Sequence, residues 1–66
     1  MNKEERDKLT ATILYGMGHY NGHARGEEAY AEAEAAFTPA QMGALHRKMR
    51  VRAEELEYND IMQGAY

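Results

Sequence analysis

The chain has few large aliphatic side chains and no cysteine, serine or tryptophan. Leucine, isoleucine, valine and phenylalanine together account for eight of its 66 residues. A core built from so few large side chains buries little area against the ~1.5 kcal/mol of conformational entropy lost per ordered residue. There is no disulfide to compensate, and three histidines do not make an evident structural zinc site. We therefore expect a homodimer, in which a second copy completes the core.

The missing residue types also narrow the function. Serine and cysteine are the commonest nucleophiles, and a chain this small is poorly suited to enclosing a catalytic pocket, so we expect no enzyme and no cofactor. No apolar run approaches the ~20 residues that span a bilayer, and the charged start Met1–Arg6 is unlike a secretion signal. We expect a cytoplasmic protein without a membrane partner. The net charge of −3 argues against a general nucleic-acid binder.

Apolar residues recur with a helical period along most of the chain, which predicts an all-α fold in one domain, residues 1–66. We expect three helices: a first over residues 3–20, a short one over 26–36 and a long one over 39–62. The residues expected on their inner faces are, in chain order, Leu9, Ile13, Met17 and Tyr20, then Tyr30, Ala33 and Phe37, then Met42, Leu45, Met49, Ala53 and Leu56.

The start of the long helix carries the clearest local pattern. Thr38 and Gln41 have the spacing of a capping box, in which each side chain accepts a hydrogen bond from the backbone N–H of the other residue. Pro39 falls at the first helical position, where its missing N–H costs nothing. Phe37 and Met42 flank the cap with the spacing of a hydrophobic staple. These signals predict a helix that begins at Pro39.

Four glycines between residues 16 and 26 leave the connection between the first two helices open to two interpretations. Asn21-Gly22 is a common turn pair and predicts a loop over residues 21–25. The alternative is a continuous helix through residues 18–26. It would align Gly18, Gly22 and Gly26 on one face, where another backbone could approach closely.

The long helix contains a basic stretch. Its permanent cations are Arg47, Lys48, Arg50 and Arg52. They could neutralise phosphates of a nucleic acid. They could instead pair with acids: if the second and third helices fold back around residue 38, opposed positions sum to about 76, which places Lys48 opposite Glu28. Within the helix, Arg50 and Glu54 also have the i,i+4 spacing of an ion pair.

Three residues suggest a metal site only if the glycine-rich segment is helical. His19, His23 and Glu27 are spaced four apart, so a continuous helix would align two imidazoles and a carboxylate for zinc or a similar cation. The glutamate of the zinc-protease pattern HExxH is absent between the histidines. Surface histidines without a metal are therefore the expectation, and these three residues are kept as candidates.

The last apolar group of the chain lies out of phase with the stripe of the long helix. It consists of Tyr58, Ile61, Met62 and Tyr66. Tyrosine offers a large contact area at low entropic cost, and methionine adapts to the shape of a partner. We expect this group to bind either a second copy of the chain or a foreign protein.

Together these observations predict a non-enzymatic interaction module that binds a larger protein and modulates or inhibits its activity. By size and class it is comparable to bacterial or bacteriophage accessory regulators. The first alternative is a dimeric nucleic-acid-binding regulator that uses the basic stretch. The second is a small anionic ligand held at an oligomer seam near residues 19–25, where glycine backbones and cations come together.

Overall fold

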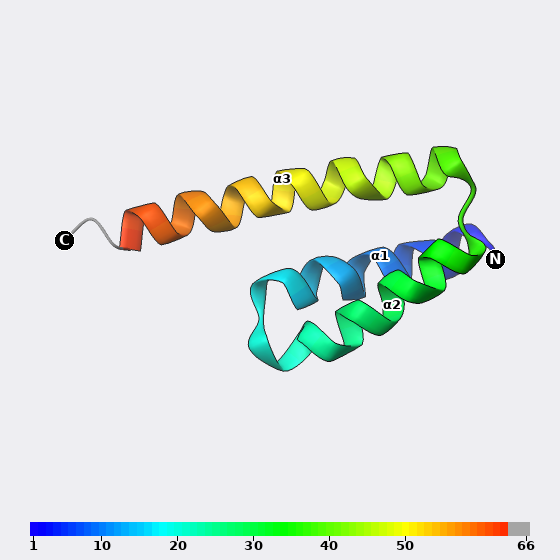
Figure 1. Ribbon diagram of the computed structural model, residues 1–66, viewed down its shortest axis with the longest axis horizontal. Helices are drawn as coiled ribbons and strands as arrows, with labels where there is room; N and C mark the ends of the chain where they lie inside the picture. The colour runs from blue at the N-terminus through cyan, green and yellow to red at the C-terminus, as the bar shows by residue number, and fades with distance from the viewer. Residues whose placement is uncertain (64–66) are drawn as a thin grey trace.

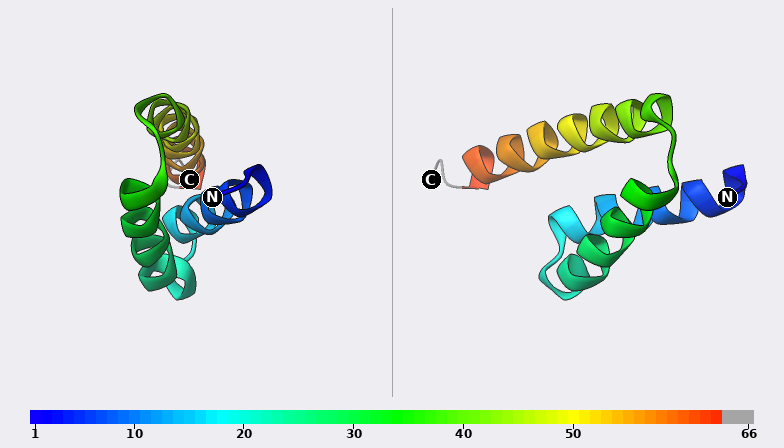
Figure 2. Two further views of the ribbon diagram at one scale, coloured as in Figure 1. Left: turned by 90° about the vertical axis from the view of Figure 1, so that its right-hand side faces the viewer. Right: turned by 45° about the vertical axis from the view of Figure 1, so that its right-hand side comes forward.

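The computed structural model describes the backbone of residues 1–63 and the side chains of residues 1–58. Its elements are the helices α1 (Lys3–Gly18), α2 (His23–Ala36) and α3 (Pro39–Gln63), with a short 3₁₀ turn, η1 (Tyr20–Gly22), between the first two. Figure 1 shows α1 and α2 folded into a narrow hairpin and α3 lying over it. The end-on view in Figure 2 likewise places α3 above that pair. The predicted all-α, three-helix arrangement is confirmed.

Helix α1 begins with a capping residue that the sequence pattern did not reveal. The Asn2 side-chain oxygen accepts a hydrogen bond of 2.8 Å from the backbone N–H of Glu5, which satisfies one of the free donors of the first turn. Glu4 and Glu5 place negative charge at the positive end of the helix dipole. The start of this helix is therefore fixed by local chemistry.

The connection between α1 and α2 matches neither interpretation of the glycine-rich segment. His19 leaves the helix in an extended conformation (φ −135°, ψ 121°), so α1 ends at Gly18 and no continuous helix runs through residues 18–26. The Gly22 N–H then donates to the His19 carbonyl at 3.0 Å and closes η1. Helix α2 starts at His23, so most of the predicted loop over residues 21–25 is helical. Tyr20, expected on the inner face, is 96% exposed because the chain has already left the helix.

Glycines make the closest contact between α1 and α2. A Cβ atom on Gly16 would lie 2.6 Å from the Gly22 carbonyl oxygen and 3.1 Å from the Gly26 Cα, which are both backbone atoms. Gly22 in turn lies against the ring of Tyr15. The predicted stripe of Gly18, Gly22 and Gly26 is therefore not the contact that forms: Gly16 takes the place of Gly18, which lies against the Arg52 and Leu56 side chains of α3. The backbones approach closely because these glycines carry no side chain.

The turn between α2 and α3 forms as predicted. The Gln41 N–H donates to the Thr38 hydroxyl at 3.2 Å, and the Thr38 N–H donates to the Gln41 side-chain oxygen at 3.0 Å. Pro39 is the first residue of α3. Across the two helices, the Tyr30 hydroxyl lies 2.8 Å from His46 Nε2. Positions 30 and 46 have the predicted sum of 76, so at this level the contact agrees with the predicted register.

The core is small and made partly of alanine. Its buried residues are Ile13, Ala29, Ala33 and Leu45. Around them pack the half-buried side chains of Leu9, Tyr30, Phe37, Met42 and Met49. The predicted inner faces of α1, α2 and the first half of α3 therefore meet at this core. No buried side-chain polar atom lacks a hydrogen-bond partner within the described part of the chain.

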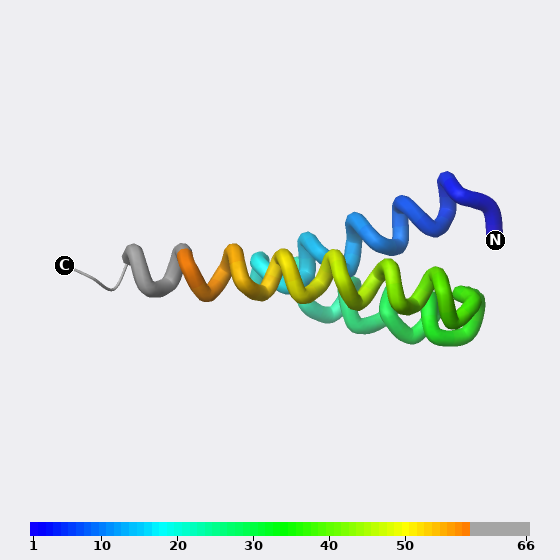
Figure 3. The backbone as a smooth tube through the Cα atoms, turned by 90° about the horizontal axis from the view of Figure 1, so that it is seen from above, coloured from blue at the N-terminus to red at the C-terminus, as the bar shows by residue number. Residues whose placement is uncertain are grey.

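Helix α3 is longer than the hairpin it covers. At 1.5 Å per residue its 25 residues extend over about 37 Å, against about 24 Å for the 16 residues of α1. Figure 3 shows α3 above α2 near the 37–38 turn and continuing beyond η1. Ala53, predicted to face the core, is exposed, whereas Leu56, predicted on the same face, is half-buried and lies against Gly18 at the end of α1. The chain is correspondingly elongated, with extents of 45 × 23 × 17 Å.

Replacement of glycine by alanine should change the free energy of unfolding in opposite directions at Gly16, which is in the close contact, and at Gly43, which is not. Gly16→Ala should destabilise the fold by about 1–3 kcal/mol, because the new methyl group meets backbone that cannot move without separating α1 from α2. Gly43→Ala is the control: its Cβ would meet only an arginine nitrogen at 3.7 Å. It should stabilise the fold by about 0.5–1 kcal/mol through helix propensity. Urea unfolding followed by circular dichroism measures both, and equal effects would contradict the proposed close packing.

Candidate functional site

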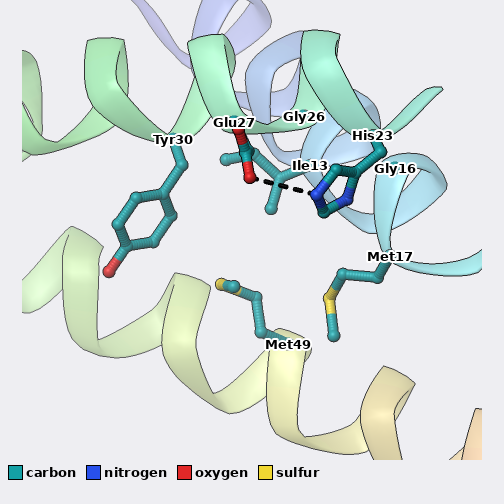
Figure 4. Close-up of a pocket in the computed structure, with 8 residues that line it drawn as sticks. All are labelled: Ile13, Gly16, Met17, His23, Gly26, Glu27, Tyr30 and Met49. Carbon is teal, nitrogen blue, oxygen red and sulfur yellow. Dashed lines mark ion pairs between the residues drawn. The ribbon is translucent and has the colours of Figure 1, made fainter.

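A groove opens between α3 and the α1–α2 hairpin. It has a volume of about 420 Å³. We call it the interhelical groove, and define it by the residues that line it: Ile13, Gly16, Met17, His23, Gly26, Glu27, Tyr30 and Met49. Figure 4 shows that these side chains come from all three helices and surround one open space. The groove is thus a product of the tertiary arrangement rather than of one segment.

The groove offers an apolar and deformable surface. Ile13 is buried against the core, and Tyr30 and Met49 pack on that core with their outer parts half-exposed. Met17 brings a second thioether from α1. Unbranched methionine side chains change rotamer at little cost, so a surface with two of them adapts to ligands of different shape. Gly16 and Gly26 form part of the lining with their backbone, where α1 and α2 are in close contact.

Charge is confined to the rim of this groove. His23 Nε2 lies 3.0 Å from a carboxylate oxygen of Glu27, one turn further along α2 (Figure 4). Both side chains are largely exposed, so the pair contributes little to stability. At the other end of the groove, the Tyr30 hydroxyl is hydrogen-bonded to His46 of α3. The rim therefore has polar groups to orient a ligand, while its interior is apolar.

The structure separates the three metal candidates. His19 turns back on α1, with its ring stacked on that of Tyr15 at 4.0 Å and its Nδ1 3.1 Å from the Tyr15 carbonyl oxygen. His23 pairs with Glu27 on α2. Among the side chains through Tyr58, no group of three histidine or acidic residues could hold a metal ion. The helical alignment that the metal hypothesis required does not form, because the chain is extended at His19.

The basic stretch of α3 does not pair with α2. Within the described part of the chain its ion pair is Arg52–Glu55, at 3.5 Å, and neither the Lys48–Glu28 nor the Arg50–Glu54 pair forms. Lys48 instead lies near enough to α1 for its charge to affect Asp7. A hydrogen bond from Lys3 lowers the pKa of the exposed Asp7 carboxyl, and the charges of Lys3, Lys48 and Arg6 add to this effect. Arg47, Lys48 and Arg50 are exposed and Arg52 is half-buried.

The predicted partner-binding group is described only at its first residue. Tyr58 is 62% exposed on α3. The side chains of Ile61 and Met62, and the whole of Tyr66, lie outside the described residues. Tyr58 belongs to the long outer part of α3, whereas the interhelical groove lies nearer the middle of the molecule.

Four of the residues that line the groove were predicted on inner helix faces: Ile13, Met17, Tyr30 and Met49. Met17, Tyr30 and Met49 do point inward, but α3 does not close over them. The signal that could have indicated a groove is the scarcity of large aliphatic side chains in the whole sequence, which leaves few residues to fill the space between α3 and the hairpin. Residue type alone does not distinguish a filled space from an open one.

Comparison with protein-family models, with curated proteins and with solved structures finds no match for this chain. The helices, over residues 1–63, include none that is long and apolar enough to cross a membrane.

The groove predicts selective binding of a small apolar probe. Titration with anilinonaphthalene sulfonate should increase the dye's fluorescence and shift the methyl resonances of Met17 and Met49, which line the groove, but not that of the exposed Met1. The measurement uses methionine labelled at the methyl carbon. Met17→Lys should reduce binding several-fold by placing a charge in the groove. Equal shifts at Met1 and Met17 would show that the dye binds without regard to this site.

Proposed function

We propose that the chain is a non-enzymatic interaction module that binds a larger protein and modulates its activity. The observation that carries the proposal is the apolar interhelical groove, open along one side and lined by Met17, Tyr30 and Met49. An amphipathic helix presents apolar side chains in a row to such a groove. Two methionines on different helices allow the groove to fit that row closely.

Several properties favour a protein ligand over a catalytic reaction. The sequence supplies neither serine nor cysteine, and the groove's interior is lined mainly by carbon and sulfur. The polar contact between His23 and Glu27 lies at the rim, where it can meet polar residues flanking an apolar stripe. In this proposal the module acts in the cytoplasm, as an accessory regulator or inhibitor of bacterial or bacteriophage type. This last part rests on an analogy of size and class.

One observation favours a second candidate, the nucleic-acid-binding regulator. Arg47, Lys48 and Arg50 are exposed within four consecutive residues of α3. Cations so arranged attract phosphates without reading a sequence, and the binding weakens steeply as salt is added. A salt-dependent mobility shift of DNA or RNA that Arg50→Glu abolishes would support this candidate against the protein-binding module. The anionic-ligand hypothesis near residues 19–25 stays a prediction.

The protein-binding proposal predicts a loss of partner for one of two matched variants. Met17→Lys places a charge inside the groove, whereas Tyr20→Lys places the same charge on a side chain that is 96% exposed and outside it. Affinity capture from the source cells should recover a stoichiometric protein with the wild type and with Tyr20→Lys. Capture with Met17→Lys should fall at least tenfold, since a buried unpaired charge is costly.

The captured protein is then purified and titrated against methyl-labelled chain. Its binding should perturb Met17 and Met49 before any other methionine of the described residues. Equal capture by both lysine variants, each with wild-type helicity, would remove the groove from the proposal.

A further inference from the structure

The face of α3 that carries Val51, which borders Leu14 of α1, presents two exposed apolar side chains. Val51 is 54% exposed and Tyr58 is 62% exposed, and both count among the large hydrophobic residues that the fold leaves open. They are seven residues apart, or about two helical turns, and therefore lie on the same side of the helix. Leu45 and Met49 occupy a different side, which packs on the hairpin.

Charges are arranged on this face with opposite signs on either side of Val51. Arg47 and Lys48 precede it by four and three residues, and Glu54 and Glu55 follow it by three and four. Residues at these spacings flank Val51 on the helix surface. All four side chains are exposed. Glu54 makes no ion pair within the described part of the chain, and Glu55 has only the exposed contact with Arg52 at 3.5 Å.

The chain exposes more surface than a compact monomer of its mass, and the excess is close to the area that one partner buries in a standard interface. Its accessible surface is 5078 Å². A folded monomer of 7.5 kDa is expected to expose about 4,200 Å², so the excess is roughly 800 Å². Each partner of a standard interface buries about 800 Å². The radius of gyration, 13.1 Å, likewise exceeds the ~10.8 Å expected for 66 residues in a compact fold.

We propose that a second copy of this chain packs along this face, with the two α3 helices antiparallel and a two-fold axis at Val51. Val51 then meets its own counterpart, and Tyr58 lies against the small Ala44 of the second copy. The axis brings Arg47 beside the second copy's Glu54, and Lys48 beside its Glu55. The symmetry repeats each pair, so the interface contains four contacts between opposite charges.

The charge order selects this arrangement over the parallel one. Two parallel α3 helices in register would oppose Arg47 to Arg47 and Glu54 to Glu54, which is repulsive. The antiparallel arrangement also leaves the interhelical groove free in each copy, because the groove lies between α3 and the hairpin and is lined by Met49 of α3 and Met17 of α1. The proposal therefore does not depend on what the groove binds, and Met17→Lys should leave the dimer intact.

The first experiment uses the absence of native cysteine. Val51→Cys provides the chain with a single thiol at the proposed axis, where it faces its counterpart. Oxidation with copper phenanthroline, or reaction with a short bis-maleimide, should give a covalent dimer at micromolar concentration. Glu32→Cys is the matched control, because it places an exposed thiol on α2, away from the axis. Equal cross-linking of the two variants, or none for Val51→Cys with either reagent, would overturn the proposal.

The second experiment reverses the charges. Arg47→Glu and Glu54→Arg should each weaken self-association about tenfold in sedimentation equilibrium, since each replaces two attractive contacts by two repulsive ones. The double variant should recover most of the wild-type affinity. Residues 47 and 54 are seven apart, roughly 10.5 Å along one helix, so a contact within the chain cannot explain the recovery. A monomeric wild type, or a double variant no stronger than the singles, would overturn the dimer.

Discussion

The close contact between α1 and α2 is the constraint on which the rest of the structure depends. Gly16 and Gly26 bring the two backbones so near that even a methyl group on Gly16 has no room. The hairpin thus gains its contacts from backbone and from Ala29 and Ala33, which suits a sequence with few large side chains. Since such a hairpin is narrow, it can cover only part of α3. The open groove and the exposed face of α3 that carries Val51 both follow from this limited cover.

The parts of the fold that depend on neighbouring residues were predictable from sequence. The capping box of Thr38 and Gln41 formed as expected, because both hydrogen bonds join residues three apart. Once that turn was placed, the length of the chain fixed the register between α2 and α3, and the Tyr30–His46 contact agrees with it. Local chemistry therefore determined one turn and, through it, a tertiary contact.

The parts that depend on distant residues were not predictable in the same way. Asn21-Gly22 lies in a turn, as its residue types predict, but α2 starts directly after it at His23, where a loop to residue 25 was predicted. The packing of Gly22 on Tyr15 and of Gly26 on Gly16 holds the backbone of this segment in place. The candidate site shows the same limitation. Apolar periodicity identified which side chains point inward, but whether the space between them is filled depends on how far α3 diverges, and the sequence pattern does not encode that angle.

The two proposals for α3 also bear on its basic stretch. If Arg47 and Lys48 meet Glu54 and Glu55 of a second copy, their charge is neutralised within the dimer. Arg52 already contacts Glu55 within its own helix, which leaves Arg50 as the main cation free to meet a phosphate. A chain with a net charge of −3 doubles that charge as a dimer, and Arg50, the cation that remains in the basic stretch of each subunit, is weak compensation for the resulting repulsion of nucleic acid. The proposed dimer therefore favours the protein-binding module over the nucleic-acid-binding regulator, because the cations that suggested the regulator would pair with the glutamates of the second copy.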